Sequence, residues 1–235
     1  MENPNRLRAA DLKKKFAVFG HFYQFSSAGH ALACRSLLEL VAHHRVPGET
    51  SQLGAARPDL LVVMMNPGSS RPLNPDYRPP TVDRWHQVPD SREWVLTRPD
   101  NTQYQIMRLM AALGLEHGRV LNLSDLREPK SPVLFKKMAD LEGVPHGEGH
   151  SVFSSPRGQE LKNLLEYQSA NKSVLVGWGR DRALLPLARL ALDRFSGWTL
   201  YGQPVNGEGT LYSHPSPMLQ RMKEAWLDQV LKQIG

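Results

Sequence analysis

The stretch Asp59-Leu-Leu-Val-Val-Met-Met65 is the strongest indicator of the fold in this chain. A continuous apolar run of this length is typical of a strand buried on both faces of a parallel sheet. The turn-forming cluster Asn66-Pro67-Gly68-Ser69-Ser70 follows directly and predicts the end of that strand. Further short strands are expected at residues 119–123, 173–178, 197–202 and 209–212.

Segments with helical periodicity alternate with these strands. Ser26 and Ser27 offer N-caps for a helix over about 28–45, in which apolar residues recur on one side. Asn101 or Thr102 is the expected cap of the next helix. Other helices are expected over 101–113, 132–141, 155–168 and 181–195, and from Pro217 onward. This alternation favours an α/β fold: a three-layer α/β/α arrangement around a central, mainly parallel four-stranded sheet.

The chain of 235 residues divides into two expected regions. Residues 58–235 are predicted to form one α/β domain, and residues 1–57 an N-terminal extension packed on it. Within the extension, the aromatic stretch 16–25 is expected to pair as a strand or pack as a flap. The proline-rich stretch 71–100 is interpreted as an extended loop, and residues 142–154 as a second loop.

Composition limits the class of protein and its partners. There are 29 Lys and Arg residues against 23 Asp and Glu, so the net charge is +6, which suits an anionic partner such as nucleic acid. Cys34 is the only cysteine, which excludes an intramolecular disulfide and a four-cysteine metal site and favours a reducing compartment. Residues 1–15 do not resemble a secretory signal, and the longest apolar run is too short to cross a bilayer. We therefore expect a cytoplasmic protein with no membrane partner.

Several familiar chemistries are disfavoured by missing motifs. There is no complete Gly-x-Gly-x-x-Gly, no Gly-x-x-x-x-Gly-Lys-Ser/Thr and no Gly-x-Ser-x-Gly. The pair His43-His44 and the group His146, Glu148 and His150 fit no common zinc spacing. We therefore expect neither a metal nor a cofactor.

Three polar clusters follow predicted strands at their carboxyl ends: Asn66–Ser69, Asn122–Ser124 and Ser213–Ser216. In sheets of this class the ligand crevice lies at the carboxyl ends of the strands. Residues far apart in sequence are therefore expected to meet around one cleft.

These clusters resemble motifs of the uracil-DNA glycosylase superfamily. The stretch Val62-Val63-Met64-Met65-Asn66-Pro67-Gly68-Ser69 is similar to its first motif, and is closest to the mismatch-specific branch with Asn-Pro-Gly. Ser213-His214-Pro215-Ser216-Pro217-Met218 resembles the second motif, His-Pro-Ser-Pro-Leu-Ser. Between them lie similar segments in the same order, 101–114, 120–122 and 174–179, so that the resemblance covers about 60–220. Asn66-Pro67-Gly68, Pro80–Arg84 and Asn122-Leu123 also look like an uncharacterised bacterial family with an Asn-Pro-Ser motif.

The resemblance implies two catalytic residues. Asn66 would orient a water molecule, and His214 would donate a hydrogen bond to the base as negative charge develops there. The main chain at Pro67, Gly68 and Ser69 would line the base pocket. Gly68 occupies the place of a bulky tyrosine in the uracil-specific branch, which leaves room for larger bases.

It also implies how the rest of a nucleotide would be bound. Asn122, whose amide has a donor and an acceptor end, would read the edge of a pyrimidine. Tyr77 would stack on the base, with Trp85 as the second candidate. Ser216 would hold a phosphate, and Met218 would act as the wedge that fills the gap left in the duplex.

The function implied is a DNA glycosylase that hydrolyses the N-glycosidic bond of a flipped uracil or related base, acting as a monomer on single- or double-stranded DNA. The first motif has no carboxylate, and Met218-Leu219 replaces the final Leu-Ser of the second. A non-catalytic protein that binds nucleic acid or a nucleotide is therefore an alternative, and an enzyme acting on a small nucleoside or nucleotide is a third. Each motif taken alone also fits a purely structural role, such as a turn after a buried strand.

Overall fold

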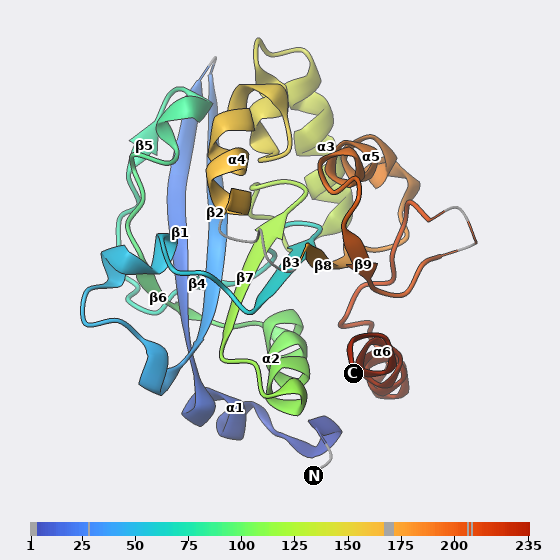
Figure 1. Ribbon diagram of the computed structural model, residues 1–235. Coiled ribbons are helices and arrows are strands. Elements are labelled where there is room, and N and C mark those ends of the chain that lie inside the picture. The colour runs from blue at the N-terminus through green and yellow to red at the C-terminus, as the bar shows by residue number, and fades with distance from the viewer. Residues whose placement is uncertain (1–3, 28, 167–171, 206, 208) are drawn as a thin grey trace.

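A single mixed sheet organises the chain (Figure 1). The structure is a computed structural model that describes residues 4–235 except 28, 167–171, 206 and 208. The strands lie in the order β4-β6-β1-β2-β7-β3-β8-β9, with β5 beside β1. The α/β class is confirmed. The expected sheet of four mainly parallel strands is not, because antiparallel strands extend the sheet on one side.

The parallel part of the sheet determines where the site lies. It contains β7 (His117–Asn122), β3 (Leu60–Met64), β8 (Ser173–Gly177) and β9 (Thr199–Tyr201), each paired in parallel with the next. In this register Met64 lies beside Asn122 on one side and beside Gly177 on the other. Three strands therefore end at the same level, and the residues that follow them meet at one edge of the sheet.

The antiparallel part is a long hairpin of β1 (Phe16–Ser27) and β2 (His30–Ala42). The expected strand over 16–25 is confirmed, but the expected helix over 28–45 is wrong. β2 lies between β1 and β7, and both of its faces are buried. Leu37 belongs to the core on one face and Leu38 to the core on the other, so the apolar pattern of β2 resembles that of a buried helix. Hydrogen-bonded pairing with β1 and β7 therefore decides that this segment is a strand, although its local sequence pattern favours a helix.

Residues 71–100 are also more ordered than a loop. They contain β4 (Arg71–Pro72), β5 (Thr81–Val82), β6 (Val95–Arg98) and a 3-10 turn at Trp85–Gln87. β6 pairs with β1, and β4 pairs with β6, so this segment continues the sheet beyond the hairpin. Residues assigned to an N-terminal extension thus supply two strands of the same sheet.

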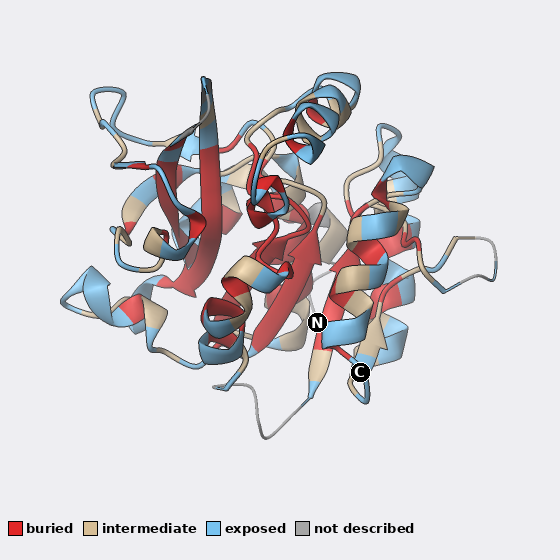
Figure 2. Cartoon of the chain, turned by 90° about the horizontal axis from the view of Figure 1, so that it is seen from above, coloured by how far each residue is buried: buried red, intermediate tan, exposed pale blue. Residues whose placement is uncertain are grey.

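Helices cover both faces of the sheet. Residues of α1 (Ala9–Lys15), α2 (Asn101–Leu113) and α6 (Gln220–Ile234) pack with Leu60 and Val62 on one face. The other face is covered by α3 (Ser131–Glu142), α4 (Gly158–Glu166) and α5 (Leu185–Arg194). Figure 2 shows the buried strands enclosed between these exposed helices. The helices predicted after residue 100 are confirmed, with shifted ends.

Buried ion pairs link the hairpin to the parallel strands. The Arg119 guanidinium on β7 donates to the Glu39 carboxylate on β2 at 2.6 Å, and His117 contacts the same carboxylate at 2.7 Å. Tyr23 on β1 donates to Asp125, which also pairs with Arg157. Since breaking a buried pair leaves an uncompensated charge, these contacts hold the two parts of the sheet in one arrangement. Within the described residues, no helix has the length and apolar character needed to cross a membrane.

Buried His150 makes the stability of the fold sensitive to acid. Its Nδ1 lies 2.9 Å from the Ser124 hydroxyl. Burial, together with the positive charge of Arg157, lowers the pKa of His150 to about 4. In the unfolded chain this histidine titrates near 6.5. Its neutral form therefore stabilises the fold fully above that value, and this contribution is lost as the pH falls toward 4.

We expect wild-type protein to lose about 2 kcal/mol more unfolding free energy than His150→Gln between neutral pH and about pH 5. Urea unfolding at the two pH values measures this difference. Exposed His86 provides the control, since His86→Gln is expected to follow wild type. Equal losses in wild type and His150→Gln would contradict the assignment.

Candidate functional site

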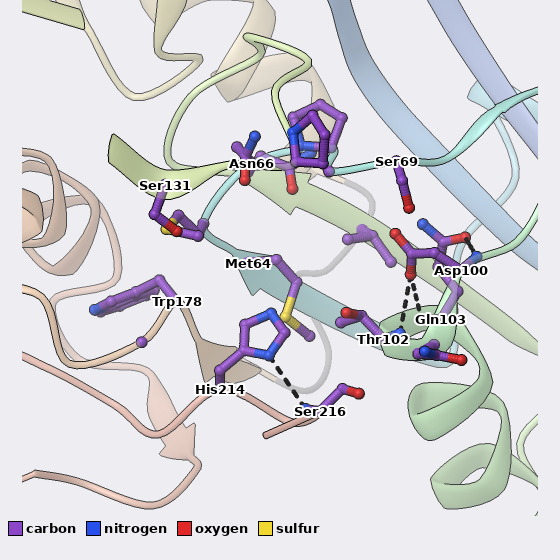
Figure 3. A pocket seen from close by; sticks show the side chains of 18 of the residues that line it. Met64, Asn66, Ser69, Asp100, Thr102, Gln103, Ser131, Trp178, His214 and Ser216 are labelled. Atoms are coloured by element: carbon purple, nitrogen blue, oxygen red, sulfur yellow. Dashed lines mark hydrogen bonds between the residues drawn. The ribbon is translucent and has the colours of Figure 1, made fainter. Parts of the chain in front are cut away.

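A cavity of about 960 Å³ lies at the carboxyl ends of β3, β7 and β8 (Figure 3). It brings together residues separated by up to 183 positions in the sequence, from Arg35 to Met218, and the three polar clusters expected to meet around one cleft all contribute to it. Every predicted site residue except Tyr77 lines it: Asn66, Pro67, Gly68, Ser69, Asn122, His214, Ser216 and Met218. The start of α2 and the segment after β8 complete the wall.

The Asn66 carboxamide is held in one orientation. Its Nδ2 donates to the Leu126 carbonyl at 3.0 Å and to the Glu128 carbonyl at 2.8 Å. Both amide hydrogens are therefore used by the loop that follows β7. Oδ1 of Asn66 has no hydrogen-bond donor among the described residues, so it can accept one from a water or ligand in the cavity.

The Asn122 amide is the most unusual group in the cavity wall. The residue is 0% exposed, and within the described residues neither Oδ1 nor Nδ2 has a hydrogen-bond partner. Burying an amide without partners costs about 1–3 kcal/mol. Native proteins rarely leave both ends of a buried amide unsatisfied. Because Asn122 lines the cavity, a molecule in the cavity that offers a donor and an acceptor, water included, can satisfy both ends of this amide.

His214 presents a hydrogen-bond donor. The Ser216 backbone N–H donates to its Nδ1 at 3.2 Å, so a neutral ring has its hydrogen on Nε2. Burial lowers the pKa of His214, and the negative charge of Asp100 opposes this only in part. The imidazole is therefore neutral at neutral pH, with Nε2–H as its donor.

Asp100 is a cavity residue that sequence reasoning missed. Its Oδ1 accepts hydrogen bonds from the backbone N–H groups of Thr102 and Gln103, so Asp100, and not Asn101 or Thr102, caps α2. Gln103, three residues later, completes a capping box, which was the available signal in the sequence. A carboxylate is thus present in the cavity, although the first motif lacks one.

Gly68 brings the main chain close to this carboxylate. Its φ of 62° lies in the left-handed region that glycine tolerates best. A Cβ at this position would lie 3.3 Å from Oδ2 of Asp100. The absence of a side chain therefore both permits the turn after β3 and leaves space beside Asp100.

Neither predicted stacking residue lines the cavity. The Tyr77 hydroxyl donates to the Glu93 carboxylate at 3.3 Å. Trp85 is buried elsewhere, with its ring stacked on Phe25 at 3.6 Å between centroids. Three aromatic residues line the cavity instead: Tyr104, Phe135 and Trp178. They come from α2, from α3 and from the end of β8, elements that only the fold brings together.

The mouth of the cavity is basic and partly apolar. Arg71, Arg98 and Arg180 line it, are exposed, and have no ion pair within the described part of the chain. Met218 also lines it and is 98% exposed, with Leu219 exposed beside it. Such a rim suits a polyanion that also offers an apolar surface, as the phosphates and bases of nucleic acid do.

Comparison with family models, curated proteins and solved structures finds no match for this chain. In the regions that the structure describes, no three His, Cys, Asp or Glu side chains are grouped so as to hold a metal ion.

Gly177 is the residue that allows His214 to reach the cavity. A methyl group at Gly177 would lie 2.9 Å from Cδ of Pro215, the neighbour of His214. We expect Gly177→Ala to displace this segment and to lower the unfolding free energy by about 1–3 kcal/mol. Chemical denaturation measures the loss. Gly158→Ala is the control, because nothing lies within 4 Å of its new Cβ; equal stability of the two variants would refute the packing argument.

Proposed function

We propose that this protein is a DNA glycosylase that hydrolyses the N-glycosidic bond of a damaged or mismatched base, uracil or a related base, flipped into the cavity. The observation that supports it most is the buried, unpartnered Asn122 amide, which lines the same cavity as Asn66 and His214. A pyrimidine edge offers the carbonyl and the N–H that such an amide requires.

The chemistry follows from the positions of the hydrogen-bonding groups. When the C1′–N bond breaks, its electron pair stays on the base and the sugar becomes cationic. The Nε2–H of His214 donates to a base oxygen and stabilises this negative charge. Oδ1 of Asn66 accepts a hydrogen bond from the water whose oxygen bonds to C1′; that water releases a proton to solvent, and the departing base takes one up. Because Asn66 is neutral, it orients the water without deprotonating it.

The rim would bind the rest of the DNA. Exposed Arg71, Arg98 and Arg180 suit the phosphates, and Ser216 lies beside the base-binding end, where the target phosphate would pass. Met218, almost fully exposed at the mouth, would enter the stack in place of the flipped base. The buried free thiol of Cys34 is compatible with work in the reducing cytoplasm.

A second candidate is a protein that binds a nucleotide or nucleic acid in this cavity without cleaving it. The neutral Asn66 at the end of β3 favours this alternative, since its amide nitrogen is already used to hold a loop. The Asn122 amide would serve binding equally well. Only an assay of base release separates the two functions.

We expect the wild-type protein to release base from oligonucleotides containing uracil, hypoxanthine, xanthine or a G·T mismatch, in at least one case. Asn66→Ala and Asn122→Ala should each reduce the rate by about 100-fold or more. Asn122→Ala should keep its Tm, because no hydrogen bond is lost. Cleavage of abasic sites after alkali treatment measures release, and Asn163→Ala on exposed α4 is the matched control.

Two results would contradict the proposal. Salt-sensitive DNA binding without release of any base would favour the second candidate. Equal release by wild type and Asn122→Ala would mean that the cavity does not hold the base.

Asp100 and Asp181 both line the cavity. Asp181 is exposed and caps the turn after β8, so Asp100 is the carboxylate that we assign to stabilising the cationic sugar. Asp100→Asn keeps a capping oxygen for α2 and removes only the charge. We expect this variant to retain its Tm and to release base about 100-fold more slowly. Single-turnover release rates, compared with melting curves of the same samples, measure the two effects. An unchanged rate would restrict Asp100 to its capping role.

A further inference from the structure

Arg35 is a buried cation in the cavity wall that neither motif includes. It lies on β2, where the sequence predicted a helix, and only 1% of its surface is exposed. Leu38 on β2 is paired with Val120 on β7, and the strands are antiparallel. Arg35 and Asn122 therefore both lie toward the end of this strand pair that borders the cavity, and both line it.

Within the described residues, the Arg35 guanidinium makes no hydrogen bond and no ion pair. Its Nε and Nη1 are buried without a hydrogen bond, and no carboxylate of the described residues is within ion-pair distance. The other large buried arginines are paired, Arg119 with Glu39 and Arg157 with Asp125. Burial lowers the pKa of Arg35 to about 10, and the negative charges of Asp100 and Asp125 oppose this shift, so the group remains cationic at neutral pH. An unpaired buried charge destabilises a fold, so this one indicates a missing negative partner.

The position of Arg35 favours the base over the phosphates as that partner. The arginines available to phosphates are exposed at the mouth, whereas Arg35, like Asn122, is a buried residue of the cavity wall. We infer that Arg35 is a further catalytic residue, which contacts an oxygen of the base and stabilises the anion that the base becomes when its bond to the sugar breaks. The identity of the ligand rests on the proposed glycosylase function; the anion site itself does not.

In this step the C1′–N bond electrons move to the base, and the negative charge spreads onto its exocyclic carbonyl oxygens. The guanidinium donates to one of these oxygens, and the His214 Nε2–H can donate as well. Neither group transfers a proton in the step. The base anion is then protonated by solvent, and the charge of Arg35 is again unpaired.

Direct binding of free bases tests the site without requiring excision. 5-Nitrouracil is an anion at neutral pH, and thymine is a neutral base that also has a 5-substituent. We expect calorimetry to show that wild type binds 5-nitrouracil at least about tenfold more tightly than thymine. Arg35→Met should remove this preference, and Arg35→Lys should keep part of it. Arg189→Met, at an exposed position of α5 outside the cavity, is the matched control and should keep it fully.

Melting curves show whether Arg35 has only a structural role. Loss of an unpaired buried charge should raise the Tm of Arg35→Met, by roughly 2–4 °C or more. Three results would overturn the inference. Wild type could bind the two bases equally, or it could bind neither. Alternatively, the preference for 5-nitrouracil could persist in Arg35→Met while its Tm is lowered. An Arg35-dependent preference in a protein that releases no base from DNA would uphold the anion site and reject the glycosylase function. Release of a base from DNA by a protein without this preference would uphold the glycosylase function and reject the anion site at Arg35.

Discussion

The parallel pairing of β3 with β7 and β8 is the constraint on which the cavity depends. Its register places Met64 between Asn122 and Gly177, so three strands end together. Apolar residues buried on both faces hold these strands at that level. A shift of the register would separate Asn66 from Asn122, and the cavity would lose its opposing walls. Gly177 also contributes to forming the cavity, because the absence of a side chain there leaves room for Pro215 and the segment that contains His214.

The cavity wall contains the two described side chains that are buried with two unpartnered polar atoms each, Arg35 and Asn122. Elsewhere, buried charges such as Glu39 and Arg119 are paired, and they join the hairpin to the parallel strands. At the cavity, the Asn122 amide and the Arg35 guanidinium are buried without partners. Both groups cost stability in the free protein and would recover it when a ligand binds. In a preorganised site of this kind, unpartnered polar groups lower the free energy of unfolding but are already in position to interact with a ligand.

The part of the site that lies in short sequence motifs could be predicted, whereas the part contributed by other elements could not. The strand expected at 209–212 before His214 does not form, and Tyr212 makes only isolated bridges. Asn66, Asn122 and His214 lie in short motifs, and all three line the cavity. The position of Tyr77 after the first motif predicts a stacking residue, but its side chain does not line the cavity and its hydroxyl donates to Glu93. Asp100 had a local signal in the capping box that was assigned to its neighbours.

The sequence by itself determined the α/β class, the first central strand and the polar residues that end the parallel strands, because these depend on local patterns of burial and turn formation. Only the tertiary structure decided that residues 30–42 form a strand, since a segment buried on both faces has the same apolar pattern as a buried helix. The pairing of this strand with β7 also places Arg35 in the cavity wall. The pairing of a strand with distant neighbours is set by hydrogen bonds and packing across the sheet, which no local window of sequence contains.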